Sequence, residues 1–295
     1  MTAVTEEFEE RLQTRAVKTQ RLYSMAVGKF ARWVRRQGFE IEAVIMNPED
    51  FNRLAQGWVS YLISRGLSPS TVRCYFAGVR KLARASRILL DVELPGAVVV
   101  EEKRLPTREM LARLIPAQPK YRAYYLLLVS SGLRPNAALG LSAEDVWLDV
   151  YEDVAVVRVP ATLSKNKRSY VTFVTPETKE ALRSYMAQRN GATKIFGLDY
   201  DSVYWKWNQR LEKCGYATKG KRFNVYRLSC LRNYFRTMLF KAGVSDEAAE
   251  AMMGHRLPLA GVYTLASDEW LAERYVDEYR KAVPLLTIYG GGGNE

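Results

Sequence analysis

The stretch SSGLRPNAALGL, residues 130–141, places a helix stop, an arginine and a helix start next to one another. Gly132 is typical of the position just past a helix, and Pro135 is favoured at the first position of a new one. Arg134 therefore lies at the junction of two predicted helices and projects from a rigid frame. A guanidinium held in this way can form a bidentate pair with a phosphate, or it can simply cap a helix.

Outward from this junction, the second half of the chain is predicted to be mainly helical with one small antiparallel sheet. Residues 154–159 and 170–174 have the composition of strands, and the lysine-rich loop ATLSKNKRS joins them. Lys165 lies at the tip of this loop, and Lys167 follows it closely. Apolar periodicity and capping residues predict the other helices, at 107–115, 121–131, 177–188, 202–213, 229–242, 246–253 and 268–282.

The first 95 residues are predicted to form a separate helical domain, with helices at 20–37, 51–65 and 69–87. The third of these has Ser68 as its expected N-cap and carries basic residues opposite its apolar stripe: Arg73, Arg80, Lys81, Arg84 and Arg87. A charged face is usually a solvated face, but residues 64–90 contain no Asp or Glu that could pair with these cations. The pattern therefore favours contact with a polyanion.

Composition shifts divide the chain into predicted domains. The segment LPGAVVVEEKRLP has prolines at both ends and no helical periodicity, and we interpret residues 96–105 as a linker. The domains expected on either side are 1–95 and 106–288. The glycine run near the C-terminus predicts a flexible tail at 289–295.

The chain has 295 residues, 48% of them hydrophobic, which is enough for a folded core. Lys and Arg outnumber Asp and Glu by 44 to 32, and the net charge of +12 favours a polyanionic partner. No apolar run has the length of a membrane span and no signal peptide is evident, so we expect a cytoplasmic protein, nucleoid-associated or in the cytoplasm of a host cell. Three scattered cysteines and one histidine make a structural zinc site unexpected.

Two further stretches carry candidate functional residues at predicted helix ends. RLSCLRNYF, residues 227–235, begins a helix and contains Arg232. MMGHRLPLAGVYT, residues 252–264, contains His255, the only histidine of the chain, and Tyr263 eight positions later. The loop GYATKGKR is close to a phosphate-binding loop, but it has Arg222 where Ser or Thr would hold magnesium, so we interpret it as a basic loop. Taken singly, each residue also has a structural explanation, as a cap, a solvated turn or a core side chain.

Taken together and in order, these segments resemble the tyrosine recombinase and integrase family. SGLRPNAALGLSAEDV is similar to the family's first arginine segment and RLSCLRNYFRTMLFKAGV to its second. MMGHRLPLAGVYT is similar to the segment with the third basic residue and the nucleophilic tyrosine. The resemblance covers residues 106–285. The helix containing SPSTVRCYFAGVRKLAR resembles the family's DNA-clamping domain, and DEWLAERYVDEYRKAVPLLTI is similar to archaeal and archaeal-virus members.

The resemblance implies a site-specific recombinase or integrase of a mobile element or virus. It would cleave and rejoin DNA strands through a covalent 3′-phosphotyrosine, with no metal, ATP or other cofactor. Tyr263 would be the nucleophile, Arg134 and Arg232 the phosphate clamps, Lys165 the general acid and His255 a further hydrogen-bond donor. These residue types suit the reaction, because the phenol attacks, the guanidinium groups stabilise charge on the phosphate, and the ammonium protonates the leaving oxygen.

This chain departs from the family pattern at three positions. Ser229 stands where the family usually has His or Lys, so one phosphate contact is weakened or passes to Arg227 or Arg222 nearby. Ala137 replaces the acidic residue expected three positions after the first arginine. Lys167 competes with Lys165 as general acid, because the loop length differs.

The resemblance also implies double-stranded DNA and further copies of the same chain as partners, from a dimer to a tetramer. The helix at 268–282 would be the protein interface, although its apolar stripe is equally consistent with packing inside the monomer. Tyr275 and Tyr279 on this helix are interpreted as core or docking residues rather than nucleophiles. The alternatives are relaxation of DNA like a type IB topoisomerase, a non-catalytic DNA-binding regulator, and a helical protein-interaction module.

Overall fold

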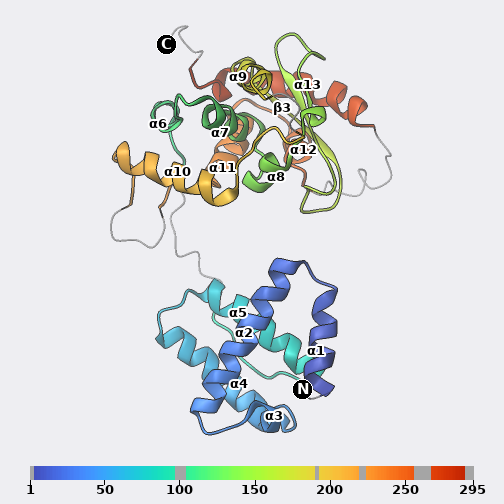
Figure 1. Ribbon diagram of the computed structural model, residues 1–295, viewed down its shortest axis with the longest axis vertical. Helices are drawn as coiled ribbons and strands as arrows, with labels where there is room; N and C mark the ends of the chain where they lie inside the picture. Colours follow the sequence, from blue (N-terminus) through green and yellow to red (C-terminus); the bar gives the residue numbers. More distant parts are fainter. Residues whose placement is uncertain (1–2, 97–103, 190–192, 219–223, 256–266, 290–295) are drawn as a thin grey trace. The chain divides into compact units, whose positions relative to one another are not determined.

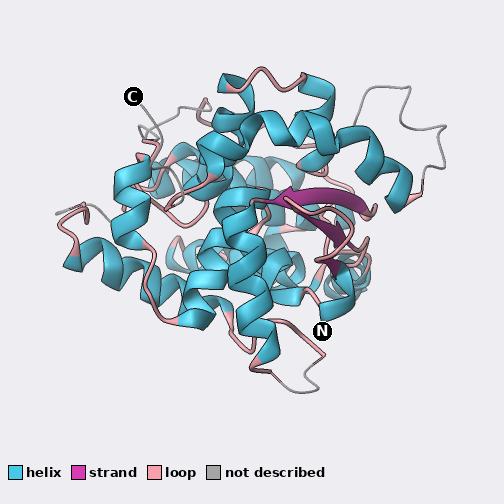
Figure 2. Ribbon diagram, turned by 90° about the horizontal axis from the view of Figure 1, so that it is seen from above, coloured by secondary structure: helices cyan, strands magenta, loops and turns pink. Residues whose placement is uncertain are grey.

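The computed structural model describes residues 3–96, 104–189, 193–218, 224–255 and 267–289 (Figure 1). Internal contacts divide the chain into two compact units, Met1–Glu101 and Glu102–Glu295. Both units are built mainly of helices, and the strands form one small sheet, as predicted (Figure 2). Most of the expected linker at 96–105 and of the expected tail at 289–295 lies outside the described residues.

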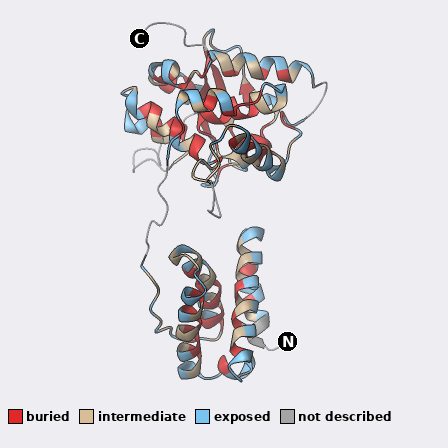
Figure 3. Ribbon diagram, turned by 90° about the vertical axis from the view of Figure 1, so that its left-hand side faces the viewer, coloured by how far each residue is buried: buried red, intermediate tan, exposed pale blue. Residues whose placement is uncertain are grey.

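The first unit is a helical bundle with its own apolar core (Figure 3). Its elements are α1 (Ala3–Gln13), α2 (Val17–Arg36), α3 (Ile41–Val44), α4 (Pro48–Ser64) and α5 (Pro69–Ala85). The ring of Phe30 is central, 5.7 Å from that of Phe51 and 5.3 Å from that of Trp58. The helices α2, α4 and α5 confirm the predicted ones, whereas α1 was not predicted, because few apolar residues interrupt its charges. Two of them, Phe8 and Leu12, are buried.

Helix α5 packs tightly against α2 and begins as predicted. The hydroxyl of Ser68 caps it by accepting a hydrogen bond from a backbone N–H of the first turn. Gly78 permits the close approach, because a Cβ there would lie 2.9 Å from the carbonyl oxygen of Tyr23. The helix ends two residues before Arg87, whose φ of 58° lies in the left-handed region. The prediction that Arg87 shares the helical face of the other arginines is therefore wrong.

The second unit surrounds one central helix, α7 (Pro119–Ser131), in which residues 123–131 are all buried. A helix that is apolar on every side is stable only inside a core, and α7 contacts α9, α11 and β3. The other helices are α6 (Arg108–Leu114), α8 (Pro135–Gly140), α9 (Pro176–Ala187), α10 (Tyr200–Lys213), α11 (Cys230–Lys241), α12 (Asp246–Met252) and α13 (Asp268–Leu286), with the 3-10 helix η1 (Ala143–Asp145). The α-helices confirm the predicted ones, whereas η1 was not predicted.

The sheet has the strand order β1-β2-β3 and is antiparallel throughout. Its strands are β1 (Val146–Trp147), β2 (Ala155–Val159) and β3 (Tyr170–Val174). Both predicted strands are confirmed, and β1 was missed because two residues carry no readable periodicity. Val159 pairs with Tyr170 at the end of the β2–β3 ladder, so the lysine-rich loop leaves the sheet at this point.

Helix α13 packs on α11 and β3 within its own unit. Tyr275 and Tyr279 are both buried, and the Tyr279 hydroxyl donates to the carbonyl oxygen of Ser130 at 2.8 Å. Both tyrosines are therefore core residues, which agrees with the interpretation that they are not nucleophiles. None of the helices in the described part of the chain is long and apolar enough to cross a membrane.

Candidate active site

Gly132 and Arg134 form a rigid turn between α7 and α8. Gly132 ends α7 with a φ of 64°, and a Cβ at this position would lie 2.2 Å from the ring of Phe235 on α11. The turn is therefore restricted to glycine and is pressed against α11. Arg134 follows as the N-cap residue of α8, but its side chain makes no capping hydrogen bond. The sequence allowed Arg134 either to cap a helix or to bind a phosphate, and its half-buried guanidinium does not cap α8.

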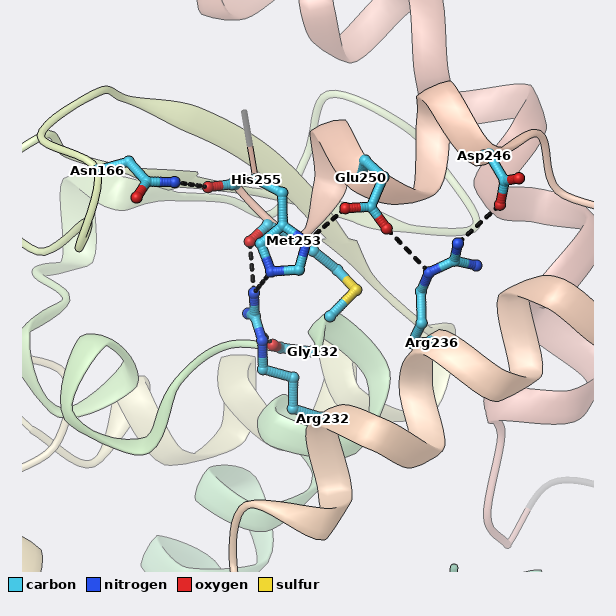
Figure 4. Close-up of polar contacts among 9 residues, drawn as sticks. Gly132, Asn166, Arg232, Arg236, Asp246, Glu250, Met253 and His255 are labelled. Carbon is cyan, nitrogen blue, oxygen red and sulfur yellow. Dashed lines mark hydrogen bonds and ion pairs between the residues drawn. The ribbon is translucent and has the colours of Figure 1, made fainter. Parts of the chain in front are cut away.

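Arg232 joins this turn to the end of α12 (Figure 4). The side chain leaves the first turn of α11 and donates from Nη1 to the carbonyl oxygen of Gly132 at 2.6 Å. From Nη2 it donates to the carbonyl oxygen of Met253 at 2.6 Å, and it lies 3.0 Å from His255 Nε2. A planar guanidinium with fixed donors is well suited to holding three acceptors at once. Arg232 therefore fixes the relative positions of Arg134 and His255.

His255 lies just past α12 because the helix ends in a Schellman turn. The N–H of Gly254, with a φ of 63°, donates to the Ala251 carbonyl, and the N–H of His255 donates to that of Glu250 at 3.0 Å. This geometry brings the imidazole back over the last turn of α12. There Nδ1 lies 2.5 Å from a carboxylate oxygen of Glu250. The histidine is thus held between a carboxylate and Arg232.

The β2–β3 loop lies against the same turn. Asn166 donates a side-chain hydrogen bond of 2.9 Å to the carbonyl oxygen of Gly254, next to His255 (Figure 4). Lys165 and Lys167 flank Asn166 and are both exposed. Lys167 has a φ of 56°, which is uncommon for a residue with a side chain. The contact of Asn166 places both lysines in the loop that borders the site, and the choice between them stays a prediction.

The two arginines are close enough to influence each other electrostatically. Burial lowers the pKa of Arg232, and the positive charge of Arg134 lowers it further, while Tyr170 and Glu250 act in the opposite direction. Burial raises the pKa of Tyr170, and the charges of Arg232 and Arg134 oppose this rise. Since arginine keeps its charge in proteins, an anion bound between the two guanidinium groups would relieve their repulsion.

Other predicted site residues have different surroundings. Ser229 is exposed just before α11 and makes no capping hydrogen bond, whereas Ala137 is buried in α8 with 5% of its surface exposed. Tyr263 and Arg222 lie outside the described residues, so their roles stay predictions. Within the described ranges, no group of three or more His, Cys, Asp and Glu side chains is arranged to hold a metal ion.

The sequence interpretation missed four residues around the site: Asn166, Tyr170, Arg236 and Glu250. Tyr170 was predicted as part of a strand, and only the fold brings its ring against Gly254. Arg236 donates from Nε to Glu250 Oε1 at 3.1 Å. Gly254 is the signal that could have identified Glu250. A Schellman turn joins the residue just after its glycine to the residue four positions before that glycine, which here are His255 and Glu250.

In the first unit, helix α5 and α1 bring cations together. Partial burial and then the charges of Arg15, Arg84 and Arg11 lower the pKa of Lys81. One hydrogen-bond donor of Arg73 is already used, since Nη1 donates to the carbonyl oxygen of Pro95 at 2.9 Å. Arg80 and Arg84 are exposed, in agreement with the predicted basic face. The DNA-binding role of these residues stays a prediction.

Replacing Lys81 with glutamine is expected to weaken duplex DNA binding without lowering the melting temperature. Folding lowers the pKa of Lys81, so the positive charge of Lys81 destabilises the folded state at neutral pH. This loss of stability becomes smaller as the pH rises and the lysine loses its proton. A lost phosphate contact should also reduce the slope of log affinity against log salt by about one. The matched control is Lys281→Gln, because Lys281 already pairs with Glu278. A variant that binds with an unchanged slope would contradict the assignment.

Sequence comparison relates the chain to archaeal recombinases, although no family model matches it. It is 26% identical over 260 residues to tyrosine recombinase XerA of Saccharolobus solfataricus, covering 83% of this chain and 81% of the relative. It is 24% identical over 301 residues to tyrosine recombinase XerA of Thermococcus kodakarensis, covering 96% and 97%.

Structural comparison agrees on the fold. The integrase of transposon Tn1549, solved in complex with circular intermediate DNA, superposes with a TM-score of 0.58 at 17% sequence identity. The superposition covers 93% of this chain and 99% of that structure. The fold of the chain is therefore that of this integrase.

Proposed function

We propose that this chain, which belongs to the tyrosine recombinases and integrases, is a site-specific DNA recombinase that breaks and rejoins strands through a phosphotyrosine on Tyr263. The observation that carries the proposal is the set of contacts of Arg232, which ties the turn of Arg134 to the end of α12 and His255. Residues about 100 positions apart in the sequence thereby surround one place where two guanidinium groups repel each other. We expect the anion bound between them to be a backbone phosphate of DNA.

The proposed reaction is a transfer of the phosphoryl group from DNA to the enzyme and back. The phenol oxygen of Tyr263 releases its proton to water and attacks the phosphorus, the bond from phosphorus to the 5′ oxygen breaks, and the 3′ end is left on the tyrosine. Arg134 and Arg232 stabilise the negative charge that develops on the phosphate oxygens. Lys165 protonates the departing 5′ oxygen. Attack by a 5′ hydroxyl on the phosphotyrosine rejoins a strand, so the bond energy is conserved and no ATP is consumed.

Lysine replacement in the β2–β3 loop should identify the general acid. Lys165→Ala is expected to lower the cleavage rate by about 10²- to 10⁴-fold, and Lys167→Ala much less. A substrate with sulfur in place of the bridging 5′ oxygen provides the test, because a thiolate leaves without a proton. The sulfur substrate should restore cleavage by Lys165→Ala, and restoration in Lys167→Ala instead would transfer the role to Lys167.

We further propose that the chain acts as a dimer or tetramer on double-stranded DNA in the cytoplasm. The apolar stripe of α13 is buried within its own unit, so the predicted interface at 268–282 would have to use its exposed polar face. Ser229 would contribute at most a short hydroxyl contact to the phosphate.

The test of the function is a recombination assay on supercoiled plasmids. Each plasmid carries two copies of the DNA that flanks the mobile element or virus encoding the chain. The proposal predicts recombinant circles in the presence of a chelator and without ATP. Relaxed plasmid without recombinants would instead support the topoisomerase-like alternative. Binding with neither product would support the regulator with an inactive site.

A further inference from the structure

Glu250 divides its two carboxylate oxygens between an arginine and the only histidine of the chain (Figure 4). Oε1 accepts from Arg236 Nε at 3.1 Å, and Oε2 lies 2.5 Å from His255 Nδ1. Arg236 is itself held by Asp246, whose Oδ1 accepts from Nη2 at 2.7 Å. The imidazole is therefore the inner end of a chain of charged groups that runs to the surface of α12.

The backbone enforces this pairing. Glu250 and His255 are the two residues that the Schellman turn of α12 brings together, and the carbonyl of one accepts from the N–H of the other at 3.0 Å. This turn usually joins two apolar side chains at these positions. Here the contact is a carboxylate against an imidazole, each about one third exposed. A surface ion pair of this kind adds little to the stability of the fold, so stability does not explain why Glu250 is paired with His255.

The partners of the imidazole define which nitrogen carries the proton. A carboxylate can only accept from Nδ1–H, and a guanidinium can only donate, so His255 Nε2 has to present its lone pair to Arg232 Nη2 at 3.0 Å. We propose that Glu250 is a positioning residue, which holds His255 in the Nδ1–H tautomer so that Nε2 orients the guanidinium of Arg232. In other enzymes, too, the group bonded to one ring nitrogen decides the role of the other.

This inference rests on the proposed function and deepens it. Two of the donors of Arg232 are fixed by the backbone carbonyls of Gly132 and Met253, and His255 fixes a second hydrogen of Nη2. The guanidinium also has a side-chain hydrogen bond with Tyr170, so its orientation is defined before any phosphate arrives. In this tautomer Nε2 accepts a hydrogen bond, so His255 can itself donate from Nε2 to a phosphate only after Nε2 takes up a proton.

The sole histidine makes the tautomer directly measurable without DNA. Protein labelled with ¹⁵N-histidine and carrying no histidine tag gives the signals of one imidazole, recorded above the ordinary imidazole titration range. The wild type should show a protonated Nδ1 and an unprotonated Nε2. Glu250→Gln should keep this pattern, because its amide oxygen still accepts, whereas Glu250→Ala should shift toward a mixture of tautomers. A protonated Nε2 in the wild type, or no shift in Glu250→Ala, would overturn the proposal.

A cleavage assay connects the tautomer to the reaction. Glu250→Ala should cleave roughly tenfold more slowly, by analogy with the loss seen when the partner of a metal-bound histidine is removed, with Glu250→Gln closer to the wild type. The matched control is Glu247→Gln on the same helix, which pairs with Arg274 away from the imidazole. Equal cleavage rates for the wild type and Glu250→Ala would refute the positioning role of Glu250 but not the proposed function. A wild type that binds DNA but never cleaves would refute the proposed function, while the tautomer measurement would still stand.

Discussion

Replacing Arg232 with alanine is expected to lower the rate of strand cleavage by about 10²- to 10³-fold while duplex binding is largely retained. The guanidinium is preorganised by Gly132, Met253 and His255, so it needs no rearrangement when charge develops on the phosphate. We expect DNA binding to use many cations of the chain, whereas the charge that develops in the transition state acts only on the few groups at the phosphate. Single-turnover cleavage of a nicked duplex at saturating protein measures this step.

Two further variants separate chemistry from folding. Arg232→Lys keeps one positive charge but cannot reach all three acceptors, so it should also be strongly impaired. Arg183→Ala removes an exposed arginine of α9 that pairs with Asp149, and it should cleave normally. Melting temperatures show whether each protein is folded. Cleavage at the wild-type rate by a folded Arg232→Ala would exclude Arg232 as a phosphate clamp.

Replacing Tyr263 with phenylalanine is expected to abolish the covalent complex between protein and DNA, with no loss of DNA affinity. The attacking oxygen is missing, and the described tyrosines near the site are poorly suited to replace it. Tyr170 is 7% exposed, Tyr279 is fully buried, and burial raises the pKa of both. Tyr275 is also buried, and its hydroxyl bonds to Glu247 at 3.2 Å.

The assay for this variant is denaturing electrophoresis after incubation with a nicked duplex that traps the intermediate. Tyr275→Phe is the matched control, because it removes a phenol from α13 and should still form the covalent complex. A covalent band that persists in Tyr263→Phe would assign the nucleophile to a different residue.

Residues that start and stop helices made much of the second unit predictable. Gly132 and Pro135 set the end of α7 and the start of α8, and the predicted strand at 170–174 has the same bounds as β3. Short or strongly charged elements were not predictable, since β1 has two residues and α1 shows few apolar positions. Arg87 was placed on a helix by spacing alone, although the chain turns left-handed there.

The contacts between distant segments could not be predicted from the sequence. Arg232 bonds to a carbonyl 100 positions earlier, and local spacing does not reveal which backbone oxygen the folded core will place there. The pairing of Asn166 with Gly254 across 88 positions has the same origin. By contrast, the pairing of Glu250 with His255 follows from the turn that ends α12 and could have been predicted from the sequence.

The most direct test of the central claim is to locate the covalently bound nucleotide by mass spectrometry. The trapped complex is digested with nuclease and trypsin, and peptide 257–274 contains Tyr263 as its only tyrosine, while Tyr275 begins the next peptide. We expect the remaining nucleotide to add its mass to peptide 257–274. A nucleotide on any other tyrosine peptide, or none in a protein that demonstrably binds the duplex, would contradict it.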